Sequence, residues 1–333
     1  MRVFSHHEEV AGLEGPVAVT IGNFDGVHRG HRALIEHARS LVRAEGGVVY
    51  VLTFSPHPVR ILAPQAAPPL ICNRHDKRRL LKGAGVDGVL EQTFTKKFAA
   101  LSPNDFVERV LARSLRAKHV VVGYDFSFGA RRAGRTTDLI SLGEQHGFAA
   151  HVISAQQVED VEGAEPFVAS SSAIRAAVAG GRLEQACQIM GRPFHVPGTV
   201  VQGDQRGRLI GFPTANLGTE HELLPQGGVY AGWLDVDGTM HPAVINVGTK
   251  PTFDGEQLTI EAHAIDVEGL DLYGKAAHVY FERRLRAEQR FDGIDALVAQ
   301  IGQDRDAARV DLQRRSPPDS LMCIDVPLPT SAS

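Results

Sequence analysis

The chain has 333 residues, 43% of them apolar and 22% charged, so it can bury sizeable cores, and its length predicts about two domains. A formal net charge of -4 provides no overall positive field for a polyanion, which argues against nucleic acid as a partner. Its three cysteines lack CxxC spacing, and no apolar run approaches the roughly 20 residues of a membrane span, so we expect a cytoplasmic protein without a membrane segment.

The first half of the chain alternates apolar runs with amphipathic segments. Residues 17–21 form an apolar run that ends at Gly22, and the segment after it has apolar residues at helical spacing from Leu34 to Val42. Further strands are predicted at 48–54, 119–126 and 149–154, and further helices at 106–115 and 137–146. This alternation predicts an α/β domain with a doubly wound parallel sheet.

The first conspicuous motif is GNFDGVHRGH at residues 22–31, between the first strand and the first helix. Its glycines allow close backbone approach to an anion, and the helix N-terminus favours phosphate. His28 and His31 are three residues apart, so we expect their imidazoles on one helical face. The motif is neither GxGxxG nor a P-loop, and HxxH without a third ligand is weak support for zinc. A nucleotide site is therefore the favoured interpretation.

Here the chain resembles the HxGH nucleotidyltransferase superfamily. TFSPHP at 53–58, VGYDFSFGARRAGR at 122–135 and SSSAIR at 170–175 narrow this resemblance to the adenylyltransferase module of prokaryotic bifunctional riboflavin kinase/FAD synthetases. In an open α/β sheet, ligands bind beside the carboxyl ends of the strands, where these motifs are expected. The implied reaction, attack of the FMN phosphate on the α-phosphorus of ATP, needs positioning and charge neutralisation rather than a covalent intermediate.

The resemblance implies roles for individual residues of this module. His28 and His31 are the implied catalytic pair. The implied ATP-binding residues are Gly22, Asn23, Phe24, Asp25, Gly26, His28, Gly30, His31, Ser171, Ser172 and Arg175. The implied FMN-binding residues are Pro56, His57, Pro58 and Asp125. The chain departs from the family pattern at Ser55, Ser172 and Tyr124, and Tyr124 raises a question about how FMN fits.

The pattern changes after residue 191 to short strands separated by Gly, Pro and Asp turns, which predicts an antiparallel barrel or sandwich. One helix is expected at 294–312, and the residues after it read as a loose tail. The predicted domains are an adenylyltransferase domain at 1–185, a linker at 186–192, a kinase domain at 193–315 and a tail at 316–333.

The second motif, PTAN at 213–216, resembles the GxPTAN motif of riboflavin kinases. Thr214 and Asn216 supply neutral oxygens on one face of an extended segment, which suits Mg²⁺ bound with ATP phosphates. The resemblance extends this ATP and magnesium site to Gly207, Gly211 and Pro213. It also implies that Glu261, in TIEAHAI, is the catalytic base on the riboflavin 5′-hydroxyl.

Matching segments extend over nearly all of residues 17–310, and together they imply that the enzyme phosphorylates riboflavin to FMN and adenylylates FMN to FAD, with Mg²⁺ as cofactor and ATP as co-substrate. Its expected small-molecule partners are riboflavin, FMN, FAD and ATP. Other adenylyltransferases of the superfamily do not account for residues 193–310. Two alternatives stay open: only one activity is retained, or the chain is a flavin-binding regulatory protein. The sequence makes no prediction of oligomeric state.

Overall fold

The computed structural model describes residues 1–158, 166–203, 212–252, 255–267 and 272–325. The chain folds into two compact units. The first comprises Met1–Pro68, Arg74–Gln157 and, of the described residues at the end of the chain, 324–325. The second comprises Pro69–Asn73 and Val158–Cys323. Among the described helices, none combines the length and the apolar character that a membrane crossing requires.

A six-stranded parallel sheet forms the centre of the first unit, which confirms the predicted doubly wound α/β fold. The strand order is β1-β4-β3-β2-β5-β8. Every residue of β2 is buried, as expected for a central strand that is covered on both faces. The strands are β1 (Arg2–Phe4), β2 (Val17–Ile21), β3 (Val48–Ser55), β4 (Gly88–Thr93), β5 (Ala117–Gly123) and β8 (Ala149–Ile153).

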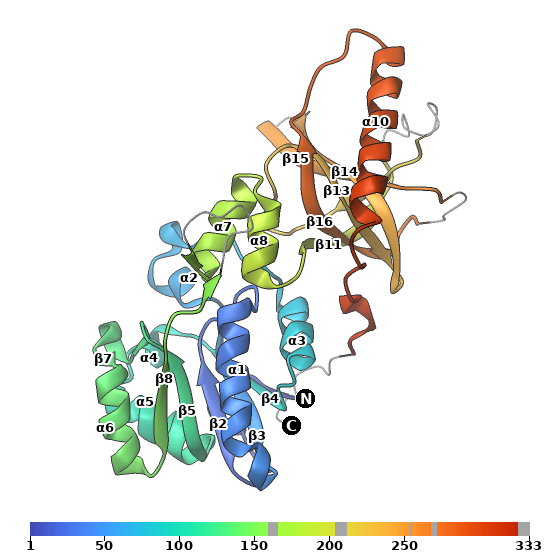
Figure 1. Cartoon of the computed structure of the whole chain (residues 1–333). Helices are drawn as coiled ribbons and strands as arrows, with labels where there is room; N and C mark the ends of the chain where they lie inside the picture. Colours follow the sequence, from blue (N-terminus) through green and yellow to red (C-terminus); the bar gives the residue numbers. More distant parts are fainter. Residues whose placement is uncertain (159–165, 204–211, 253–254, 268–271, 326–333) are drawn as a thin grey trace. The chain divides into compact units, whose positions relative to one another are not determined.

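Helices cover this sheet, and α1 packs against β2, β3 and β5 while α6 packs against β8 (Figure 1). The helix predicted at 106–115 forms as a short α-helix followed by the π-helical η4. The elements are α1 (Arg29–Val42), α2 (Pro58–Leu62), α3 (Arg74–Gly83), α4 (Lys96–Ala99), α5 (Pro103–Phe106), η4 (Val107–Ser114) and α6 (Thr136–His146), with a small hairpin of β6 (Ser127–Phe128) and β7 (Gly134–Arg135).

A buried ion pair joins α3 to β4. Arg78 donates two hydrogen bonds of 2.7 Å to the Glu91 carboxylate, and Arg74 also bonds to it. Glu91 and Arg78 are each 2% exposed. Burial alone would raise the pKa of Glu91, but the hydrogen bonds and charges of Arg78 and Arg74 hold that pKa below its ordinary value. Glu91 is therefore ionised at neutral pH and fixes α3 to the sheet.

The second unit contains a closed barrel of antiparallel strands in the order β11-β12-β15-β14-β13-β16. Of the two predicted architectures, barrel and sandwich, the structure therefore has the barrel. Apolar side chains at alternate positions fill its interior, including Leu217, Ile245 and Ile260. Helix α10 packs against β13, β14 and β16 (Figure 1). The elements are β11 (Phe194–Val201), β12 (Ala215–Gly218), β13 (Gly228–Val236), β14 (Thr239–Thr252), β15 (Gly255–Ala264), β16 (Ala276–Arg286) and α10 (Ile294–Leu312).

Two helices precede the barrel, α7 (Ser171–Ala179) and α8 (Leu183–Met190), where the sequence predicted one helical stretch. The break falls at Gly180 and Gly181, and Gly181 adopts φ +71°, a left-handed conformation that ends a helix. Both helices belong to the second compact unit. A functional domain boundary near residue 185 stays a prediction.

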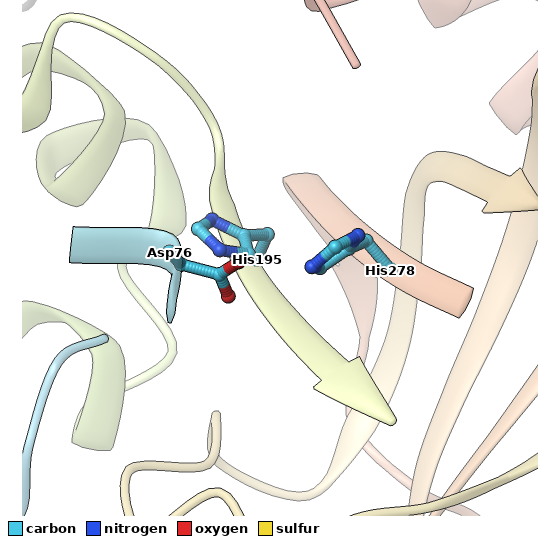
Figure 2. A group of neighbouring side chains, drawn as sticks. All are labelled: Asp76, His195 and His278. Carbon is cyan, nitrogen blue, oxygen red and sulfur yellow. The ribbon is translucent and has the colours of Figure 1, made fainter. Parts of the chain in front are cut away.

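Within the predicted tail at 316–333, residues 320 and 321 form hydrogen bonds with buried groups of the barrel. Ser320 Oγ donates to the carboxylate of buried Asp235 at 2.6 Å, and the Leu321 amide donates to the Tyr280 hydroxyl at 3.3 Å. The rings of His195 on β11 and His278 on β16 both lie near that of Tyr280, and the centroids of the two histidine rings are 5.4 Å apart. Figure 2 shows the two histidines. Asp76, also drawn in Figure 2, belongs to α3 of the first unit.

A pair of histidines makes the stability of the first unit sensitive to pH. His119 Nδ1 and His151 Nε2 lie 3.1 Å apart on β5 and β8, and burial lowers the pKa of both. Below the ordinary value of 6.5, the unfolded chain therefore binds protons that the folded chain binds more weakly. We expect the melting temperature of the first unit to fall as pH decreases through about 6.5. Thermal unfolding at several pH values checks this, and His151→Gln should flatten the profile.

Candidate functional sites

The predicted motifs of the first unit lie after three adjacent strands of the parallel sheet. Strand β3 ends at Ser55, β2 at Ile21 and β5 at Gly123, and the order β3-β2-β5 makes these strands neighbours. Because parallel strands share one carboxyl edge, residues 22–31, 56–58 and 124–125 meet at that edge. The chain departs from β2 to β3 on one side and returns to β5 on the other, so this is also a topological switch point of the sheet.

His28 and His31 form a stacked pair at the start of α1. Their ring centroids are 3.7 Å apart with an interplanar angle of 24°, and His28 is 6% exposed. His28 is the N-cap residue, and its Nδ1 accepts a hydrogen bond from the His31 amide at 3.4 Å. The expectation that both imidazoles share one face is confirmed. They lie at the positive end of the helix dipole, which favours an anion.

The loop before His28 has an unusual backbone. Phe24, Gly26 and Val27 all adopt positive φ, at 48°, 83° and 40°. Glycine tolerates this conformation, but a β-branched residue such as Val27 rarely adopts it. The Phe24 and Val27 side chains are fully buried, and Asp25 is 1% exposed. Such strain clusters at ligand sites, and the glycine-rich motif alone gave no indication of it.

The residues predicted to bind FMN lie at the same edge of the sheet. His57 follows β3 and caps α2, with its Nδ1 accepting from the Val59 amide at 3.3 Å, and it lies between Pro56 and Pro58. Asp125 is exposed in a turn after β5, where the Phe126 amide donates to the Gly123 carbonyl. Tyr124 is 55% exposed in that turn.

The third predicted part of the nucleotide site lies in the second unit. Ser171 and Ser172 open α7, as expected, and Ser170 caps that helix by accepting a hydrogen bond from the Ala173 amide at 3.2 Å. Arg175 Nε donates to the Pro69 carbonyl at 2.7 Å. Because His28 belongs to the first unit, the approach of this helix to the same nucleotide stays a prediction.

In the barrel, a row of polar residues crosses three neighbouring strands. Asn216 on β12 is the register partner of Glu261 on β15, and Glu261 is also the partner of Asn246 on β14. Cross-strand partners lie on the same face of a sheet. The neighbours of these residues in each strand face the barrel core, so the row lies on the outer face. Sequence reasoning missed Asn246, and only the strand register could reveal it.

Contacts around PTAN hold this segment beside the row. His263 lies two residues after Glu261 on β15, and its Nδ1 donates to the Pro213 carbonyl at 2.8 Å. Burial lowers the pKa of His263. Thr214 is half-buried and immediately precedes β12. A Cβ at Gly203 would come within 2.5 Å of the Asn216 amide. Gly207 and Gly211 lie outside the described residues.

Two family models match the chain. A model described as FAD synthetase matches residues 12–165, and one described as riboflavin kinase matches residues 190–312. The first range contains the strand edge with His28 and His31, and the second contains the barrel with Asn216 and Glu261.

Curated bacterial proteins are similar over most of their length. A bifunctional riboflavin kinase/FMN adenylyltransferase of Escherichia coli is 41% identical over 91% of this chain and 95% of its own. Proteins with the same description are 37% identical in Pseudomonas fluorescens, over 87% of this chain and 91% of that one, and 34% identical in Bacillus subtilis, over 91% and 94%.

A solved structure is similar over almost the whole chain. A crystal structure described as a macrolide-efflux protein from Streptococcus pneumoniae has a TM-score of 0.81 and 30% identity, covering 92% of this chain and 98% of that one. That description differs from those of the curated relatives. The relatives and both family models agree with each other and with the two sites.

Proposed function

From the premise that the chain belongs to the family of bifunctional riboflavin kinase/FMN adenylyltransferases, which two family models and up to 41% identity show, we propose where its two reactions take place. The protein is an enzyme with both activities: it phosphorylates riboflavin to FMN and adenylylates FMN to FAD, and ATP is the co-substrate of both steps. We assign the adenylyl transfer to the carboxyl edge of the parallel sheet and the phosphorylation to the outer face of the barrel.

The stacked pair of His28 and His31 is the observation that carries the adenylyl site. Two imidazoles above a helix N-terminus can bind the phosphates of ATP and stabilise charge that develops on the α-phosphorus. Residues 22–26 form the loop that leads to His28, and Gly30 lies in the first turn of α1. His57 and Asp125 follow the neighbouring strands, where the flavin is held in this proposal. The family resemblance also implies ATP contacts for Ser171, Ser172 and Arg175 of the second unit, and this role stays a prediction.

The row of Asn216, Glu261 and Asn246 supports the kinase site. Glu261 is the proposed base that takes the proton of the riboflavin 5′-hydroxyl. The cofactor Mg²⁺ fits this place, because the Asn216 side chain and the half-buried Thr214 hydroxyl offer the hard oxygen donors that it prefers. When bound, Mg²⁺ neutralises charge on the ATP phosphates. His263 holds PTAN at its Pro213 carbonyl.

One experiment tests both assignments of activity. The purified protein is incubated with riboflavin, ATP and Mg²⁺, and FMN and FAD are followed by chromatography. We expect FMN to appear first and FAD to accumulate after it. A protein that makes FMN and no FAD, or that uses only supplied FMN, would lack one of the activities.

The carboxamides on either side of Glu261 give a prediction of their own. Asn216→Ala removes an oxygen donor, so we expect FMN production to need a higher Mg²⁺ concentration. Asn246 flanks Glu261 on the opposite side, so Asn246→Ala should lower the rate of FMN production without changing its dependence on Mg²⁺. Titration of Mg²⁺ at fixed ATP checks this. An unchanged magnesium requirement in Asn216→Ala would remove Asn216 from the metal site.

We also propose a cytoplasmic location. Both reactions consume ATP, and Cys72, Cys187 and Cys323 form no disulfide within the described part of the chain, as is usual for proteins of a reducing compartment. Cell fractionation with an antibody against the chain tests this location.

A further inference from the structure

We propose that Lys77 and Thr53 are positioning residues for adenylyl transfer, because they clamp the Asn23 carbonyl and so hold the strained loop that leads to His28. Thr53 Oγ1 and Lys77 Nζ each donate a hydrogen bond of 3.0 Å to that carbonyl oxygen. Thr53 is the first residue of the TFSPHP motif but received no role of its own in the sequence analysis, and Lys77 lies outside all of the predicted motifs. The inference rests on the proposed function of the His28 site.

The loop needs an external restraint. The three positive-φ residues, Phe24, Gly26 and Val27, follow directly after Asn23, and strained backbone persists only where its surroundings determine it. On the strand side, the Gly22 amide donates to the Leu52 carbonyl at 3.1 Å. The Asn23 carbonyl lies one residue further along, immediately before Phe24, the first residue with positive φ.

The two donors reach this oxygen from separate elements. Thr53 lies on β3 and is 1% exposed, whereas Lys77 lies on α3 and is half-buried. A carbonyl oxygen has two lone pairs and can accept both hydrogen bonds. The bond from the ammonium group is charge-assisted, which makes it stronger than a bond between neutral groups. The peptide after Asn23 is therefore fixed to both the sheet and the helix.

Helix α3 is itself held in place, which makes Lys77 a defined support. Arg78, the next residue, donates two hydrogen bonds to buried Glu91 on β4, and Arg74 also bonds to Glu91. The ion pair joins the sheet to α3, and Lys77 joins α3 to the loop. A shift of α3 would move the Asn23 carbonyl and, five residues later, the N-cap His28.

The clamp consists of the two hydrogen bonds that Thr53 and Lys77 donate to the Asn23 carbonyl. Its loss should affect the chemical step more than ATP binding. Displacement of a reacting group by about 1 Å can cost up to roughly 10²-fold in rate. We expect Lys77→Met and Thr53→Val each to lower kcat for FMN adenylylation about tenfold, with little change in KM for ATP. The kcat for riboflavin phosphorylation should stay normal, because the barrel is a separate unit.

Matched variants separate positioning from general damage. Thr53→Ser keeps the hydroxyl and should restore kcat. Lys82→Met removes a lysine from the same helix that bonds to the Asp325 carbonyl instead of the loop, and it should behave like the wild type. A direct readout is the imidazole NMR signals of His28, which should shift in Lys77→Met and Thr53→Val and stay unchanged in Lys82→Met.

The outcomes distinguish the clamp from the site. Normal kcat and unshifted imidazole signals in both Lys77→Met and Thr53→Val would overturn the clamp, even if His28→Ala abolishes FAD formation. A rise in KM for ATP in Lys77→Met alone would show that Lys77 contacts the nucleotide, which also overturns positioning. If His28→Ala forms FAD normally, the proposed site fails, whereas shifted imidazole signals would still support the clamp.

Discussion

Replacement of His28 by alanine is expected to block FAD formation while FMN accumulates from riboflavin. The variant loses one imidazole of the stacked pair, which also caps α1 through its Nδ1 atom. Loss of one preorganised group that stabilises transition-state charge costs roughly 10²- to 10³-fold in rate. The barrel retains its kinase residues, so riboflavin should be phosphorylated at the normal rate. Chromatography of the products over time, with riboflavin, ATP and Mg²⁺ supplied, checks both statements.

The control is His28→Asn, which retains a capping side chain at the start of α1 but lacks the imidazole. We expect it to melt at the wild-type temperature and still to form FAD slowly, which would assign the loss to chemistry rather than to helix capping. FAD formation at the wild-type rate in His28→Ala would show that the stacked pair does not take part in the reaction.

The strands of the first unit could be predicted where their residues are uniformly apolar, and could not where they are short or polar. Strand β2, with five buried residues, lies at the predicted bounds of 17–21. Strand β4 escaped prediction because it carries Glu91 and Gln92, which are both buried. Arg78 of α3 compensates the buried charge of Glu91, and the His7 amide donates a hydrogen bond to the Gln92 side chain. Such long-range compensation leaves no periodic signal in the sequence.

The candidate sites show the same division between local and long-range information. Spacing alone predicted that His28 and His31 share a face, because both lie within one helical turn. Asn246 and Lys77 could not be found in this way. Asn246 is related to Glu261 through barrel register, and Lys77 reaches Asn23 across 54 residues of chain. The positive φ of Val27 could not be predicted either, because β-branched residues rarely adopt this conformation.

Replacement of Glu261 by glutamine is expected to abolish riboflavin phosphorylation and to leave adenylylation of supplied FMN nearly normal. The amide retains the shape of the side chain between Asn216 and Asn246 but cannot accept the hydroxyl proton. General-base catalysis contributes roughly 10²- to 10⁴-fold, so the loss should far exceed assay noise. The variant is given riboflavin in one reaction and FMN in another, with ATP and Mg²⁺ in both.

Glu220→Gln is the matched control, because it makes the same change at an exposed glutamate that follows β12 and lies outside the row formed with Asn216 and Asn246. It should phosphorylate riboflavin at the wild-type rate. Full FMN production by Glu261→Gln would refute the base assignment. Glu261 and His28 lie in different compact units, so a local change in the barrel has no reason to slow adenylyl transfer. If Glu261→Gln also lost FAD production from supplied FMN, the proposal that the two sites act independently would be refuted.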